Sequence, residues 1–236
     1  MIRRQVTKHF RGKPTVACVE NINGSIDPTQ RLPREKEIYL DSDGSQSMYY
    51  GNLVCLRPLE MTDLDEIMLF ENEWGLRRWA GVPLPKSRQA IQEWLEKASV
   101  ADPWRDGTIH LAVTDKESGA FVGVTRLYNI KTPHRRACLG LAVYNPDNRS
   151  KGYGTDATWV MLWVAFNVLG LHSVYIDTME KNAHAIHVAE KAGFRKIGLF
   201  RETEFIDGVY TGLVYLDILE KEFFAQYPIG TPIGEP

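Results

Sequence analysis

The sequence predicts an α+β (mixed α/β) domain in which helices flank a central sheet of mixed strand direction. Two observations predict this fold class. Strand-like segments follow one another in the first half of the core, at 108–114, 120–128 and 136–144. Further along, strand-like and helical segments alternate, which is typical of strand–helix–strand units. Apolar residues make up 44% of the 236 residues, which is enough to bury a core.

The first core elements are a strand and two helices. The strand covers 52–57 and is closed by Pro58. A helix over 61–72 follows, with Thr62 as its N-cap and acidic residues in its first turn. The segment 87–98 is predicted to be the second helix, because its apolar residues fall on one helical face.

The second half of the core begins with a long helix over about 155–169, whose apolar residues recur at helical spacing. Near the end of the core, Asp207-Gly208 predicts a hairpin, because this pair favours a tight turn between two strands. The other predicted elements are a strand over 173–178, a helix over 183–192 ended by Gly193, a strand over 194–199, and a final hairpin in which 205–210 turns through Asp207-Gly208 into 213–219.

Three parts are expected along the chain. Residues 1–49 form an N-terminal appendage, with a possible hairpin and a loop rich in Asn, Asp, Ser and Gly. Residues 50–225 form the main domain, and 226–236 form a C-terminal tail. The family-like motifs described below begin at 50, so the appendage is predicted to be dispensable for cofactor binding.

Composition and charge exclude several classes of protein. The net charge is −2 with both signs interspersed, which argues against nucleic acid as a partner. Cys18, Cys55 and Cys138 are far apart, so neither a disulfide framework nor a thiolate metal site is expected. No apolar stretch follows the charged start, and the longest one, 159–170, is too short to cross a bilayer. We therefore expect a cytoplasmic protein without a membrane segment.

A glycine-containing loop between a strand and a helix is the most informative motif. It reads Arg149, Ser150, Lys151, Gly152, Tyr153, Gly154 and Thr155. Glycines let backbone N–H groups point into one concavity, a helix N-terminus adds unpaired donors, and two cations suit a diphosphate. The loop lacks the Walker A pattern and the third glycine of a dinucleotide fingerprint. By itself, a structural glycine turn remains an equal alternative.

Further motifs in the same order resemble the GNAT superfamily of acetyltransferases. They include Asn182-Ala-His-Ala-Ile186, Glu190-Lys-Ala-Gly-Phe194 and Arg201-Glu-Thr-Glu-Phe-Ile-Asp-Gly208. The resemblance extends from about 50 to 219 and looks closest to the RimJ/RimL-type branch. It implies two splayed parallel strands that hold acetyl-CoA, used as a co-substrate without a metal. A homodimer is also expected from the family.

The resemblance also implies roles for individual residues. The strand at Leu141, Ala142 and Val143 would pair its backbone with the pantetheine arm, and the amides of 149–155 would bind the pyrophosphate. The Val143 N–H would stabilise the oxyanion. Asn182 would bind near the thioester, although an N-cap role ahead of Ala183 is equally compatible with the sequence.

The candidate catalytic side chains depart from the family pattern. Many relatives carry Glu at the position of Cys138 and a Tyr acid at that of Ala189. Glu204, or Glu202 through a water, is predicted to be the general base, since alternate strand residues share a face. Solvated edge-strand acids are the alternative. The pair of histidines on the helix over 183–192 is not expected to bind metal.

The acids near the first helix, between 63 and 73, can attract a cationic amine or simply form a solvated helix face. The predicted function is transfer of an acetyl group from acetyl-CoA to a primary amine by direct attack in a ternary complex. The acceptor can be a protein N-terminus, a polyamine or a small-molecule amine. The alternative is a catalytically inactive CoA-binding sensor or assembly module.

Overall fold

A computed structural model describes residues 49–81 and 84–228 and has a mixed sheet at its centre. Within these residues eight strands form one sheet in the order β1-β2-β3-β4-β5-β6-β8-β7. Only β5 and β6 pair in parallel, and all other neighbours are antiparallel. The strands are β1 Tyr49–Tyr50, β2 Val54–Pro58, β3 Ile109–Asp115, β4 Phe121–Lys131, β5 Arg136–Val143, β6 Ser173–Met179, β7 Arg195–Ile206 and β8 Val209–Leu219.

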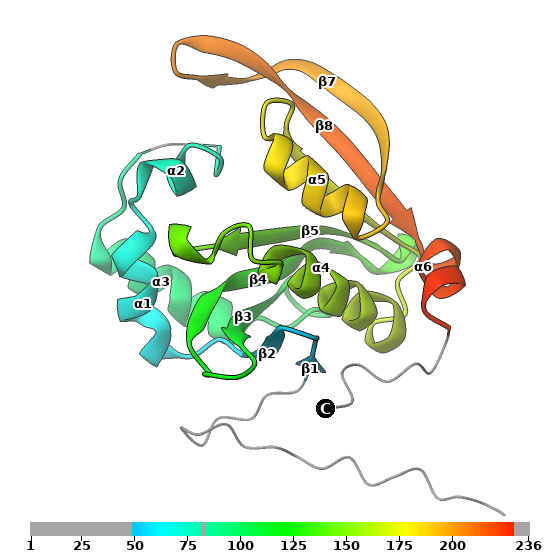
Figure 1. Ribbon diagram of the computed structural model, residues 1–236, viewed down its shortest axis with the longest axis horizontal. Helices are drawn as coiled ribbons and strands as arrows, with labels where there is room; N and C mark the ends of the chain where they lie inside the picture. Colours follow the sequence, from blue (N-terminus) through cyan, green and yellow to red (C-terminus); the bar gives the residue numbers. More distant parts are fainter. Residues whose placement is uncertain (1–48, 82–83, 229–236) are drawn as a thin grey trace, which may run out of the picture. The chain divides into compact units, whose positions relative to one another are not determined.

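Helices cover both faces of this sheet. Figure 1 shows α1 beside α3, and α5 beside the β7–β8 hairpin. One core cluster joins α1 and α3 to β3 and β4, and a larger one joins α4, α5 and α6 to the opposite face. The helices are α1 Leu64–Phe70, α2 Trp74–Arg77, α3 Arg88–Ser99, α4 Tyr153–Trp163, α5 Ala183–Lys191 and α6 Glu220–Gln226. Short 3-10 turns cover Met61–Asp63, Thr132–His134 and Pro146–Asn148.

Two predicted helices are divided in the structure. The helix predicted over 61–72 is a 3-10 turn followed by α1, and Thr62 is not its cap. Instead, the Asp63 carboxylate accepts from the Glu60 N–H at 2.9 Å and pairs with Arg57. The helix predicted over 155–169 starts earlier, at Tyr153, and ends as a π-helical turn over Val164–Val168. The cap of α3 is Ser87, whose Oγ accepts from Ala90 N–H.

The last two strands form one long hairpin, whereas the sequence predicts a strand over 194–199 and a separate hairpin after it. The strand predicted over 194–199 continues to Ile206 as β7, and Asp207-Gly208 is the turn, as predicted. Pairing with β8 shifts between Phe200 and Glu204, because Phe200 pairs with Leu213 but Glu204 with Thr211. The strand therefore carries extra residues, a β-bulge, in this stretch.

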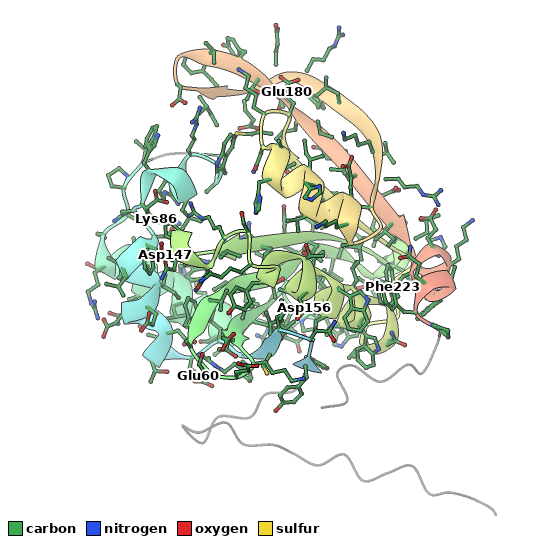
Figure 2. All side chains as sticks on the ribbon, viewed as in Figure 1. Glu60, Lys86, Asp147, Asp156, Glu180 and Phe223 are labelled. Carbon is green, nitrogen blue, oxygen red and sulfur yellow. The ribbon has the colours of Figure 1, made fainter. Side chains whose placement is uncertain are left out.

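The described part of the chain begins at Tyr49, which pairs with Leu56 and thus already belongs to the sheet. The predicted appendage over 1–49 otherwise lies outside the described residues, as does most of the tail over 226–236. At the other end, Phe223 of α6, which Figure 2 labels, packs against the ring of Phe166, with 5.3 Å between centroids. Among the helices of the described residues, none is long and apolar enough to span a membrane.

Candidate active site

The parallel strands β5 and β6 separate after three paired residues. Their ladder runs from Arg136↔Ser173 to Cys138↔Tyr175 and ends there. Beyond this rung β5 stays with β4 up to Val143, while β6 stays with β8 up to Met179. The two strands therefore diverge toward their C-terminal ends, which confirms the predicted splayed pair.

Hydrogen bonding to β4 shows which groups of β5 face this opening. The Tyr144 N–H donates to the Val122 carbonyl at 2.9 Å. In an antiparallel ladder this bond makes Val143 and Gly123 a pair without mutual hydrogen bonds, so the N–H and C=O of Val143 point away from β4. The same holds two residues earlier for Leu141, whereas Ala142 turns its backbone groups to β4. Of the three predicted residues, Leu141 and Val143 thus have N–H and C=O groups that point toward β6 and away from β4.

The predicted phosphate loop lies between the end of β5 and the start of α4. Ser150 and Gly152 adopt positive φ values of 62° and 94°, and Gly152 is the N-cap of α4. No side chain caps this helix, so the N–H groups of its first turn remain available within the described structure. Together with the dipole of an 11-residue helix, these N–H groups form a site that fits a pyrophosphate.

The charged and aromatic side chains of this loop have different partners. Lys151 is exposed. Arg149 donates to Glu73 Oε2 at 3.2 Å and therefore ties the loop to α2. The pKa of Glu73 is lowered, first by the N–H of Gly75 and also by Arg149. The hydroxyl of Tyr153 donates to Asp115 at 2.7 Å, which holds the ring in place. Tyr153 can therefore contribute its backbone N–H to the anion site, but not its side chain.

Asp156, in the first turn of α4, is a positioning residue that the sequence interpretation missed. Its buried carboxylate accepts three backbone N–H groups, from Asn52 at 3.1 Å, Leu53 at 2.8 Å and Val54 at 3.0 Å. Figure 2 labels it on α4. The contact fixes the N-terminal end of α4 to the start of β2, and the only sequence signal for it was an acid in a first helical turn.

Asn182 caps α5 at the end of β6. Its Oδ1 accepts from the Ala185 N–H at 3.2 Å, and its Nδ2 donates to Thr178 Oγ1 at 3.2 Å. The capping role is therefore confirmed, and its contact with a cofactor stays a prediction. His184 and His187 on the same helix are exposed, and no group of three potential metal ligands occurs among the described residues.

The acids of the first helical region mainly stabilise the fold. Asp63 is buried against Arg57, and Glu71 is buried against Arg77 at 3.1 Å. Glu71 also accepts from the hydroxyl of Tyr144 at 3.1 Å. These carboxylates already have charged or hydrogen-bonding partners, so they are poorly suited to attract an amine substrate.

The predicted catalytic carboxylates lie on β7, the outermost strand. Glu202 is exposed and has a φ of 53° inside the bulge, while Glu204 is half-buried and pairs with Thr211. Alternation along the strand is interrupted between them, so the expectation that they share a face on that ground is wrong. At the two positions where the family pattern is broken, Ala189 is 1% exposed and Cys138 is fully buried.

A family model described as the acetyltransferase (GNAT) domain matches residues 54–195. The chain therefore belongs to the GNAT acetyltransferase family and is an N-acetyltransferase.

Three similar proteins illustrate the relationship. Spermidine N(1)-acetyltransferase of Escherichia coli K12 is 26% identical over 175 residues, which cover 74% of this chain and 90% of that protein. The probable N-acetyltransferase YjcK of Bacillus subtilis is 27% identical over 184 residues, which cover 74% and 98%. A structure of spermidine N-acetyltransferase from Vibrio cholerae, in complex with CoA and spermine, is 25% identical, with a TM-score of 0.64 and coverage of 73% and 98%.

Proposed function

We propose that this protein transfers an acetyl group from acetyl-CoA to a primary amine, by direct attack of the amine in a ternary complex. The observation that carries the proposal is the opening between β5 and β6, which leads to the uncapped N-terminus of α4. An extended pantetheine arm can pair with a strand edge of this kind, and a pyrophosphate suits the helix N-terminus. The similar structure in complex with CoA supports this assignment.

Each part of the site then has a chemical role. Bound acetyl-CoA supplies the thioester whose carbonyl carbon the amine attacks. The N–H of Val143 points into the opening and stabilises the negative charge that develops on the carbonyl oxygen. Leu141 pairs with the pantetheine arm, and the amides of 149–155 hold the pyrophosphate together with Lys151. Asn182 lies at the other strand's end, where its capped helix borders the arm.

We further propose a polyamine-type acceptor and membership of the RimJ/RimL-type branch. Two of the similar proteins are named for spermidine acetylation, which supports an aliphatic amine. Neutralising such an amine, with a pKa near 10.4, costs about 4.6 kcal/mol at pH 7, so a general base is needed. Glu204, or Glu202 through a water, is the base that the sequence predicts.

Release of CoA thiol in the presence of acetyl-CoA and a panel of amines tests this function. We expect spermidine and spermine to be acetylated faster than a peptide α-amine or a simple monoamine. The buried Ala189, in place of a phenol, favours the alternative of an inactive CoA-binding module. Such a module would bind acetyl-CoA in calorimetry and release thiol with none of the amines.

A further inference from the structure

A carboxylate, a thiol and a phenol meet where β5 and β6 begin to separate. Asp177 Oδ1 accepts from Cys138 Sγ at 3.3 Å and from the hydroxyl of Tyr128 at 3.4 Å. The ring of Tyr128 is in turn covered by the guanidinium of Arg126, 4.5 Å from its centroid. Within the described residues both side-chain hydrogen bonds of Asp177 end on Oδ1, which leaves Oδ2 for an incoming donor.

The two donors keep their protons at neutral pH. Burial raises the pKa of Cys138 to about 12, and burial also raises the pKa of Tyr128. The two hydrogen bonds fix the orientation of the Asp177 carboxylate, and the protonated Cys138 is an unsuitable nucleophile.

The strand register places Asp177 at the closed end of the opening. It lies two residues beyond Tyr175, the last residue of β6 that pairs with β5. Because side chains alternate along a strand, Asp177 shares the face of Tyr175 and Cys138. Val174 and Ile176, on the opposite face, belong to the core under α4. Asp177 is half-exposed and accessible from the side away from α4.

Aromatic rings accompany Asp177 on this face. Asp177 pairs directly with Tyr215 of β8, whose ring stacks on that of Tyr175 with 6.4 Å between centroids. Burial, followed by the charge of Asp177 and more weakly that of Glu204, raises the pKa of Tyr215. Ring faces and carboxylates both attract ammonium groups, so this face suits a cationic amine.

We propose that Asp177 accepts the proton of the acceptor ammonium through one water, an inference that rests on the proposed function. An N–H bond of the ammonium breaks, its proton passes to the water, and a proton of that water passes to Oδ2. The freed lone pair forms the C–N bond and the C–S bond breaks. The second amine proton moves to the departing thiolate, and Asp177 returns its proton to solvent.

The geometry favours Asp177 over Glu204 as the base. Val143 lies three residues beyond the level of Asp177, about 10 Å along the strand, which the carbonyl, the amine and one water can span. Glu204 is two strands to the side of β6, about 10 Å away. Its partner Thr211 lies four residues along β8 from Tyr215, in the direction in which Val143 lies from Asp177, so Glu204 is close to the level of Val143 but three strand spacings, about 14 Å, to the side of β5. Glu204 is better placed to bind a second ammonium group of a polyamine.

The test compares Asp177→Asn with three other variants of the full chain, using spermidine as the acceptor. Asp217→Asn is the matched control, because Asp217 is a half-buried aspartate that pairs with Tyr175 on the neighbouring strand. Glu204→Gln tests the alternative base. Cys138→Glu combined with Asp177→Asn returns a carboxylate to the same place from β5. Acetyl-CoA affinity and thermal melting report whether each variant is folded.

We expect Asp177→Asn to lower kcat/KM by about 10²–10⁴-fold at pH 7. This loss shrinks toward pH 10, where solution supplies neutral amine, whereas a merely structural loss would not depend on pH. Asp217→Asn stays near wild type, and the double variant recovers activity even if Asp177→Asn alone is poorly folded. Wild-type activity in Asp177→Asn, or a pH-dependent loss in Glu204→Gln instead, overturns the role of Asp177 but leaves the proposed function standing. A wild-type protein that binds acetyl-CoA but acetylates no amine overturns the proposed function as well.

Discussion

Among single residues, the two glycines of the phosphate loop impose different constraints. Gly152 has a φ of 94°, and a Cβ there would lie 3.0 Å from Leu53 Cδ1. Gly154 lies within α4, and a Cβ there would meet Leu141 and Val188 at ordinary contact distances of 3.6 Å and 3.8 Å. Gly152 is therefore required by its backbone conformation. Gly154 is not required by the fold, and only a cofactor that lies close to it would need the absence of a side chain there.

We expect Gly152→Ala to lower the free energy of unfolding by about 1–2 kcal/mol, because an L-residue is strained at this φ. Gly154→Ala is expected to be neutral or stabilising by up to about 1 kcal/mol, since Ala favours helix over Gly. Denaturant unfolding measures both. Equal losses in the two variants would contradict this difference.

The same positions test the cofactor site. Gly152→Val and Gly154→Val each place a branched side chain beside the amides that bind the pyrophosphate, so both are expected to weaken acetyl-CoA binding by 10-fold or more, about 1.4 kcal/mol. Calorimetric titration provides the affinity. Affinities equal to wild type in both variants would place the pyrophosphate elsewhere.

At the scale of elements, α2 is a short connection between the phosphate loop and the hairpin. Glu73 caps it by accepting from Gly75 N–H and Leu76 N–H, each at 2.8 Å, and it also pairs with Arg149. Beyond the helix, Arg78 pairs with Asp207 at the turn of the hairpin, at 3.0 Å. A movement of the phosphate loop can therefore displace α2 and, through it, the turn of the hairpin.

We expect Glu73→Gln to strengthen acetyl-CoA binding by about 2- to 5-fold, because a half-exposed ion pair is worth up to about 1 kcal/mol and its loss frees Arg149 for the pyrophosphate. The amide oxygen can still accept one of the two N–H groups that Glu73 caps in α2. In an Arg149→Gln background the same substitution should have no effect. A calorimetric double-mutant cycle decides this, and additive effects would mean that Glu73 and Arg149 do not compete.

The contact between α3 and β3 makes stability depend on pH. His110 lies under Trp94, with 5.9 Å between ring centroids, and burial, followed by the charge of Arg126, lowers its pKa to about 4. Its folded pKa is below the unfolded value of about 6.5, so the unfolded chain binds the extra proton between these values. The stability that the neutral His110 contributes is therefore fully present above pH 6.5 and is lost as the pH drops toward 4.

We expect the melting temperature of wild type to fall more between pH 7 and pH 4.5 than that of His110→Gln, which has no titrating ring. Differential scanning calorimetry at several pH values measures the two slopes. Parallel curves would show that acid sensitivity arises from carboxylates elsewhere in the chain.

The sequence could predict what depends on local pattern. The approximate positions of most strands, the loop ahead of α4 and the hairpin turn follow from glycine placement and apolar spacing. Contacts between distant segments could not be predicted in this way. Arg149 and Glu73 are 76 residues apart, and Cys138 and Asp177 are 39 apart on strands whose register no local signal fixes. The bulge in β7 was also hidden, because it depends on pairing with β8.

In the whole molecule, the proposed site lies at the C-terminal ends of β5 and β6, within the matched range 54–195. The hairpin of β7 and β8 extends beyond that range and forms the far edge of the sheet. Whether residues 1–49 are dispensable for cofactor binding stays a prediction. A folded chain that starts near Ser47 keeps Tyr49 of β1 and should bind acetyl-CoA with the affinity of the full chain.

The hairpin of β7 and β8 is the expected surface for self-association. Its edge strand carries large apolar side chains that are mostly exposed, including Phe200 at 63% and Phe205 at 61%. Unpaired edges and exposed apolar patches of this kind mark association sites, which agrees with the homodimer expected from the family. We expect Phe200→Glu to lower the apparent mass toward that of a monomer in sedimentation experiments. Leu69→Glu, at an equally exposed position on α1, should leave the mass unchanged, and a monomeric wild type or equal effects of both variants would contradict association through this hairpin.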